Sequence, residues 1–150
     1  MFRGLQDILG ENYDAQYKAK ADTVVGMGVV KDYATGEFKF PGSDTANDIY
    51  FVTKDMQPTG IQTVYGEVSE YELQNIKAGE YALLVSGKKG ERFFTDQFES
   101  GIAVGNRVIV GTGGKFKAAS SEKSNMICAN ADAKDAGSHS GIIIEIVDWN

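Results

Sequence analysis

The stretch Gly141-Ile-Ile-Ile-Glu-Ile-Val147 does most to decide the fold. β-Branched side chains such as isoleucine and valine favour extended backbone. A nearly continuous apolar run of this length is typical of a strand and too short for an ordinary helix. The run therefore predicts a β-strand, and its lack of polar alternation predicts burial on both faces.

Two strand–turn–strand patterns precede this stretch. Residues 80–86 and 91–95 are rich in Tyr, Leu, Val and Phe, and they flank the polar turn Gly-Lys-Lys-Gly. Residues 107–111 and 115–118 flank Thr-Gly-Gly in the same way. Glycine tolerates the positive φ that tight hairpin turns require, so both patterns predict β-hairpins.

The first half of the chain repeats the strand and turn signals. Strands are predicted at residues 23–30, 37–40 and 49–53, and the turn formers of residues 41–48 separate the last two. Residues 61–75 fit neither strand nor helix periodicity and are expected to be a loop, with a short helix as the alternative. Turn signals every 8–12 residues predict a mainly β protein, a small β-barrel or sandwich of short antiparallel strands.

The first 21 residues differ from the rest. Apolar and aromatic residues recur there at intervals that suit an amphipathic helix, although Gly10 interrupts them. An extended arm that docks on a neighbouring subunit fits these residues equally well. We therefore predict an N-terminal arm or short helix over residues 1–21 and a β-barrel or sandwich domain over residues 22–150. The candidate contact residues of the arm are Phe2, Leu5, Ile8, Leu9, Tyr13 and Tyr17.

Composition and charge exclude several classes of partner. The net charge is −6 and the pI is near 4.8, so phosphate backbones and anionic lipid surfaces would be repelled. We expect no nucleic acid and no membrane partner. Cys128 is the only cysteine, which rules out an intrachain disulfide and argues against a structural zinc site. No apolar segment is long enough to predict a signal peptide or a membrane span, and no cofactor is expected.

Glycine motifs give no convincing nucleotide site. The sequence Gly111-Thr-Gly-Gly-Lys115 resembles a phosphate loop only superficially, because Phe116 stands where Ser or Thr is needed and no helix follows. It is interpreted as a hairpin turn. Gly26 and Gly28 lack the third glycine of a dinucleotide fingerprint. They are interpreted as a bulge or a close approach of two backbones.

Candidate catalytic residues are equally weak. His139, the only histidine, has Asp132 and Asp135 nearby, but its small neighbours predict a surface loop. Cys128 lies in a strand pattern and is expected to be a small buried hydrophobe. The remaining acids are expected on solvated faces, among them Glu67, Glu70, Glu72, Asp96 and Glu99. We therefore predict no catalytic residues and no enzyme.

A group of phenylalanines and the order of strands and turns along the chain point instead to a protein that binds other protein subunits. Phe93, Phe94 and Phe98 form a cluster in which some side chains are expected in the core and others as an exposed interface anchor. Residues 76–80 open a strand, and residues 104–110 lead into Gly-Gly-Lys-Phe at residues 113–116. In residues 140–146, near the end of the chain, a glycine is followed by an aliphatic strand. In these features the chain resembles the capsid decoration, or cement, proteins of tailed bacteriophages and related small virion β-barrel proteins.

The resemblance implies a structural virion protein that binds and stabilises the capsid exterior. Its partner would be the major capsid protein, and a homo-oligomer, a trimer by analogy, would be expected. Such a protein is made in the host cytoplasm and ends on the capsid surface. A phage tail or head–tail protein is the alternative in the same class. Other classes are a small hydrolase using His139, or a carbohydrate-binding β module with aromatic platforms at Tyr65, Tyr71, Tyr81 and Trp149.

Overall fold

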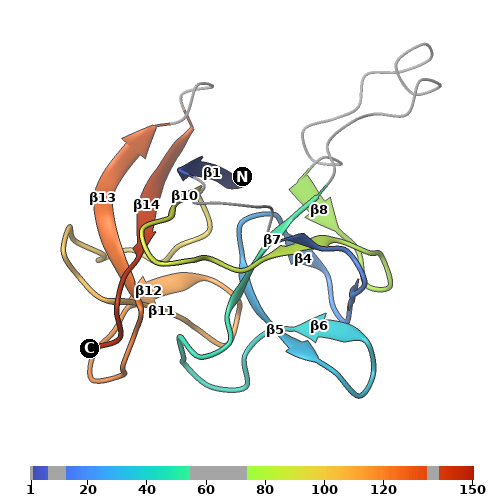
Figure 1. Cartoon of the computed structure of the whole chain (residues 1–150). Helices are drawn as coiled ribbons and strands as arrows, with labels where there is room; N and C mark the ends of the chain where they lie inside the picture. Colours follow the sequence, from blue (N-terminus) through green and yellow to red (C-terminus); the bar gives the residue numbers. More distant parts are fainter. Residues whose placement is uncertain (1, 7–12, 55–73, 135–138) are drawn as a thin grey trace, which may run out of the picture.

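The computed structural model describes residues 2–6, 13–54, 74–134 and 139–150 (Figure 1). These residues form short strands and almost no helix. The strands are arranged in several small sheets, and within the described residues they do not make a closed barrel. Every strand pair is antiparallel except one. The prediction of a mainly β fold built from short antiparallel strands is confirmed.

Three strands from the second half of the chain and the N-terminal strand form a four-stranded sheet. Its order is β1 (Phe2–Gln6), β10 (Arg92–Thr95), β14 (Ser140–Ile146) and β13 (Met126–Lys134). The predicted strand at residues 141–147 is thus the inner strand β14, and β13 pairs with it through two irregularities of register. A two-stranded sheet of β11 (Val108–Val110) and β12 (Phe116–Ala118) lies beside it and is the hairpin expected from the sequence. The terminal Ile146 and the buried strand β11 pack into the same core.

A six-stranded sheet forms the other part of the molecule. Its order is β2 (Tyr13–Asp14), β9 (Leu83–Val85), β7 (Tyr50–Thr53), β5 (Gly28–Asp32), β6 (Glu37–Lys39) and β3 (Lys18–Ala19). The sheet curls, because the Ala19 N–H donates to the Glu80 carbonyl at 2.8 Å and the Gly79 N–H donates to the Ala19 carbonyl at 2.7 Å. These bonds bring the β3 edge back to the residues that precede β9. The small pair β4 (Thr23–Val24) and β8 (Asn75–Ile76) adds to this part.

Two hydrophobic cores lie on opposite faces of β7 and β9. Neighbouring side chains of a strand point to opposite faces, and accordingly Phe51 and Val85 join one core while Val52 and Leu84 join the other. We call the part around the first core, with β10, β11, β12, β13 and β14, the C-terminal lobe. The part around the second core, with the curled sheet, is the curled lobe. Figure 1 shows the two lobes side by side with β7 between them.

The expectation that the strand at residues 141–147 is buried on both faces is wrong. Ile142, Ile144 and Ile146 are buried, whereas Ile143 and Glu145 are only half-buried. The outer face is polar enough for the carboxylate of Glu145 to pair with Arg92 of β10, with Nε 3.1 Å from Oε2. The strand therefore has one core face and one outer face, as antiparallel strands commonly do.

The N-terminal residues are extended rather than helical where the structure describes them. Phe2 and Leu5 lie in β1, which pairs with β10, while Ile8 and Leu9 lie outside the described residues. Tyr13 is exposed in β2, and Tyr17 packs against the second core. The first 21 residues thus contribute strands to both large sheets. No helix among the described residues is long and apolar enough to cross a bilayer.

Candidate binding surfaces

A cluster of tyrosines around one lysine covers the end of the second core. The Lys31 ammonium lies 4.8 Å from the centre of the Tyr17 ring and 4.3 Å from that of Tyr50. Its Nζ is 2.6 Å from Asp14 Oδ2, and Tyr33 meets Tyr17 edge-on at 6.2 Å. We call these five residues the tyrosine–lysine cluster. Strand pairing builds it, since β2, β5 and β7 belong to the same curled sheet.

The charges in this cluster are fixed by their neighbours. The hydrogen bond from Lys31 holds the pKa of Asp14 below its usual value. Burial by itself would lower the pKa of Lys31, but the bond to Asp14 and the nearby tyrosines outweigh it and the pKa is raised. Burial and a hydrogen bond to Tyr33 raise the pKa of Tyr50. Each group keeps its ordinary charge at neutral pH, which suits a rigid binding surface better than proton transfer.

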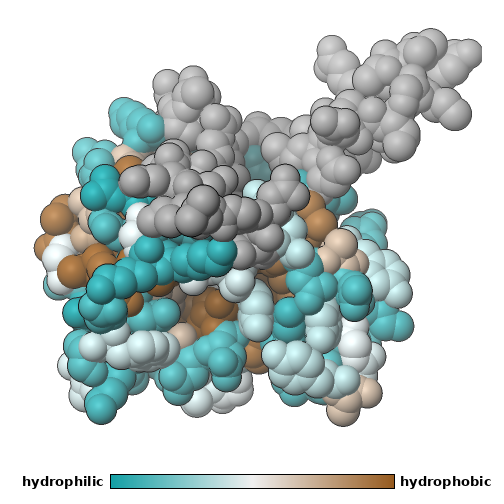
Figure 2. Space-filling model, viewed as in Figure 1, coloured by the Kyte–Doolittle hydropathy of each residue, from teal (hydrophilic) through white to brown (hydrophobic). Residues whose placement is uncertain are grey.

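Three large aromatic side chains of the curled lobe are exposed over more than half of their area. Tyr33 is 75% exposed, Tyr81 64% and Tyr13 52%. Tyr13 belongs to β2, Tyr33 follows β5, and Tyr81 bridges to Lys18 of β3. The face seen in Figure 2 is mostly hydrophilic, with hydrophobic residues in separate small areas. Exposed tyrosines on such a background are candidate interface anchors.

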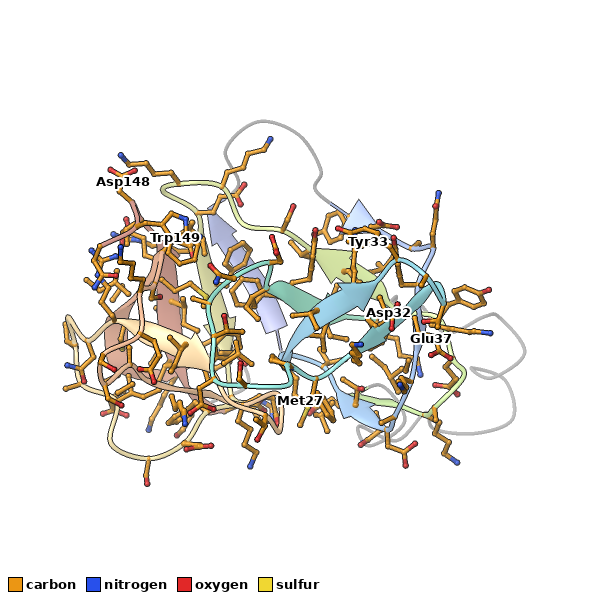
Figure 3. The ribbon with its side chains drawn as sticks, turned by 90° about the horizontal axis from the view of Figure 1, so that it is seen from below. Met27, Asp32, Tyr33, Glu37, Asp148 and Trp149 are labelled. Carbon is orange, nitrogen blue, oxygen red and sulfur yellow. The ribbon has the colours of Figure 1, made fainter. Side chains whose placement is uncertain are left out.

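The C-terminal lobe carries a hollow of about 230 Å³ beside Trp149. Buried apolar side chains from three strands line part of it: Phe51, Met126 and Ile146. Polar and aromatic side chains at or near the surface line the rest: Asp48, Ser86, Asn125 and Trp149. Figure 3 shows Trp149 and Asp148 on the opposite side of the molecule from Tyr33 and Asp32. The hollow and most of the tyrosine–lysine cluster therefore lie on different sides of the molecule, and Tyr50 is the residue that belongs to both.

The residues considered for catalysis do not come together in the described part of the chain. His139 is half-buried just before β14, Asp132 is exposed in β13, and Asp135 lies outside the described residues. Within the described ranges no three His, Cys, Asp or Glu residues are grouped as metal ligands. Cys128 is 1% exposed, as predicted, and burial raises the pKa of its thiol. A raised pKa keeps the sulfur protonated and poorly nucleophilic.

Only two of the five acids expected on solvated faces lie in the described part of the chain. Glu67, Glu70 and Glu72 lie outside the described residues. Asp96 is half-buried and accepts a hydrogen bond from the Gln97 side chain at 2.9 Å, while Glu99 is exposed.

The glycine motifs have structural roles. Gly111 to Lys115 form the β11–β12 turn, in which the Gly111 N–H donates to the Lys115 carbonyl at 2.9 Å. A Cβ on Gly28 would lie 2.5 Å from Val110 Cγ2, and Gly26 has a φ of 97°. The hairpin turn inferred from the sequence is confirmed. At Gly28 the close neighbour is the Val110 side chain and not a second backbone.

The aromatic residues considered as interface anchors or sugar platforms lie partly in the core and partly on the surface. Phe93 and Phe94 are buried and Phe98 packs against the first core, so the idea that some of them form an exposed anchor is wrong. The Phe51 ring lies tilted against Phe93 and stacks on Phe116, with ring centres 4.5 and 5.3 Å apart, so Phe93 is packed inside the first core. Tyr65 and Tyr71 lie outside the described residues, whereas Tyr81 and Trp149 are exposed.

Sequence reasoning missed the tyrosine–lysine cluster. A signal was present, because Val29 and Lys31 are two residues apart on one strand and must point to the same face. Val29 is fully buried, so the stem of Lys31 has to lie against the core and its ammonium needs a partner. The partner, Asp14, is distant in sequence and could not be identified without the pairing of β2 with β9.

Comparison of the chain with known proteins finds no matching family model, no similar curated protein and no similar solved structure.

Proposed function

We propose that the chain is a non-catalytic structural protein that attaches to the exterior of a phage capsid. The major capsid protein is the proposed partner, and a trimer of this chain is the proposed oligomer. The resemblance to capsid decoration proteins supports the virion context, and it rests on residues 76–80, 104–110, 113–116 and 140–146. A protein of this kind would stabilise the shell by binding its assembled state in many symmetric copies.

The observation that carries the proposal is the exposure of Tyr13, Tyr33 and Tyr81 on one lobe. Tyrosine contributes large contact area at a small cost in side-chain entropy, and it is enriched among residues that dominate binding energy. Tyr33 is also held in place, since it packs on Tyr17 and hydrogen bonds to Tyr50. An ordered aromatic surface loses less conformational entropy on binding than a mobile one.

Co-sedimentation of the purified chain with empty capsid shells and, separately, with isolated tails tests the proposal. We expect saturable binding to shells at a fixed copy ratio. Light scattering measures the oligomeric state of the chain before it is mixed with shells. Replacing Tyr33 and Tyr81 together by serine should weaken binding at least about tenfold, because each is a candidate hot spot.

The matched control is Val104→Ser in the C-terminal lobe. It replaces an apolar side chain that is 65% exposed by a polar one. Its affinity for shells should equal that of the unchanged chain, and circular dichroism should show that all variants fold. Binding to tails alone would move the protein to the tail or head–tail class. Absence of binding to both assemblies would refute a structural role in the virion.

A further inference from the structure

Four chain segments meet at the hollow beside Trp149. They are the residues leading into β7, the end of β9, the start of β13 and the end of β14. Asp48 reaches it from a left-handed backbone conformation, with a φ of 53°, and is the only non-glycine residue of this kind among those described. Such a conformation is uncommon for a residue with a side chain and commonly marks a turn or a functional position.

The residues on both sides of Trp149 are anchored by hydrogen bonds. The Asp148 carbonyl accepts a hydrogen bond from Arg107 Nη1 at 2.8 Å, and its carboxylate pairs with Lys89. On the other side, Asn150 Oδ1 accepts a hydrogen bond from the Ser124 N–H at 2.8 Å. The Trp149 side chain remains 48% exposed. An aromatic ring presented by a fixed backbone is a preorganised stacking platform.

The polar side chains of the hollow have unused hydrogen-bonding capacity. Within the described part of the chain, the side chains of Asp48, Ser86 and Asn125 make no hydrogen bond or ion pair. They offer a carboxylate, a hydroxyl and an amide, which together can both donate and accept. They surround a space with apolar side chains at its base. A ligand for this site should therefore have several hydroxyl groups and one apolar face.

We propose that this hollow binds a single neutral sugar ring. The C–H face of a pyranose would stack on Trp149, and its hydroxyls would hydrogen bond to Asp48 and Asn125. A volume of about 230 Å³ suits one ring, since pockets for larger drug-sized ligands start at about 300 Å³. The Asp48 carboxylate and the net charge of −6 disfavour acidic sugars.

A site for an organic cation fits the residues less well. Aromatic cages for ammonium groups present several ring faces to the charge. Besides Trp149, two aromatic residues line this hollow. The Tyr50 ring already faces the Lys31 ammonium at 4.3 Å, and the buried Phe51 ring packs against Phe93 and Phe116. Only Trp149 is left as an uncommitted aromatic face, and three hydrogen-bonding side chains accompany it.

The proposed sugar site does not depend on the proposed attachment to capsids.

Tryptophan fluorescence reads this site directly, because Trp149 is the only tryptophan of the chain. The whole chain is titrated with the methyl glycosides of glucose, galactose, mannose and N-acetylglucosamine, and separately with tetramethylammonium chloride. We expect a saturable change of emission with at least one glycoside and a Kd on the order of 1 mM, typical of a small ligand in an open site.

Variants of the lining distinguish this site from unspecific quenching. Asp48→Gly suits the positive φ at that position, and Asn125→Ala removes the amide, so each should weaken binding at least about tenfold through loss of hydrogen bonds. Asn47→Ala is the matched control, because Asn47 is exposed next to Asp48 but does not line the hollow. Its Kd should be unchanged. Trp149→Ala, followed by saturation-transfer NMR of the glycoside, should abolish binding.

Three results would overturn the proposal. The first is a linear response to every glycoside. The second is saturation by tetramethylammonium without saturation by any sugar. The third is a loss of affinity in Asn47→Ala as large as in Asn125→Ala, with all variants folded by circular dichroism.

Discussion

Gly141 occupies a position in β14 where no side chain fits. A Cβ there would lie 2.5 Å from Phe94 Cζ and 2.6 Å from the carbonyl oxygen of Thr95. The second contact is with the backbone of the neighbouring strand β10, which cannot move without disturbing the sheet. We expect Gly141→Ala to lower the free energy of unfolding by about 2 kcal/mol, within the range for overpacked sites. Urea denaturation measures the loss.

The control for this substitution is Gly113→Ala in the β11–β12 turn. No atom lies within 4 Å of a Cβ built at Gly113, so its free energy of unfolding should change by less than about 0.5 kcal/mol. Equal losses of unfolding free energy in the two variants would show that the close packing around Gly141 does not exclude a larger residue there.

The Asp14–Lys31 pair should make stability depend on pH. The pKa of Asp14 in the folded chain lies below its value in the unfolded chain, so the ionised carboxylate stabilises the fold. This contribution is fully present above the unfolded pKa of about 3.8 and is lost as the pH falls through the folded value. The melting temperature of Asp14→Asn should therefore be lower than that of the unchanged chain at pH 7, and the gap should close in acid.

Asp132→Asn serves as the comparison for Asp14→Asn, because Asp132 is exposed and makes no ion pair with the described residues. Its melting temperature should follow that of the unchanged chain at every pH. A gap for Asp14→Asn that stays constant down to pH 2 would mean that the ion pair with Lys31 is not its cause.

At the scale of the element, β14 has two faces of unequal burial. Ile144 is fully buried in the first core, and Ile143, its neighbour, is half-buried on the outer face. Removing a buried isoleucine side chain loses its transfer free energy and leaves a cavity. Ile144→Ala should therefore lower the free energy of unfolding by about 3 kcal/mol, and Ile143→Ala by about 1 kcal/mol.

The two alanine variants differ by one position and have the same change of side chain, so each controls the other. Guanidinium denaturation gives both values in one experiment. Similar large losses would restore the expectation that this strand is buried on both faces.

The strands of only two residues could not be predicted from the sequence. Local signals, namely apolar runs and glycines, predict the strands and turns of residues 80–86, 91–95 and 107–118. Tyr13–Asp14 and Lys18–Ala19 carry no such signal and are strands only because β9 and β6 offer partners. Their extended state depends on pairing with distant residues.

At the scale of the whole molecule, β7 and β9 link the two cores. Phe51 and Val52 are adjacent in the chain, and each is buried in a different core. Unfolding either core would expose one face of both strands. We therefore expect calorimetry to show one transition, with a van't Hoff enthalpy equal to the calorimetric enthalpy.

Val52→Ala tests this coupling further, because it removes side chain only from the second core. It should lower the melting temperature of the single transition, read both by the fluorescence of Trp149 in the C-terminal lobe and by far-ultraviolet circular dichroism. A variant in which the Trp149 signal melts separately from the circular dichroism would show that the lobes unfold independently.

The sequence by itself determined the β class, most of the longer strands, the β11–β12 turn and the burial of Cys128. These features depend on local chemistry, namely β-branched and aromatic residues, glycines at turns and short apolar runs. Tertiary structure alone decided the curl of the six-stranded sheet, the sharing of β7 between two cores, the ion pair of Asp14 with Lys31, and the position of Asp48 and Trp149 at one hollow. Each of these joins residues far apart in the chain, and such contacts follow from sheet order and register, which the local pattern of residues does not specify.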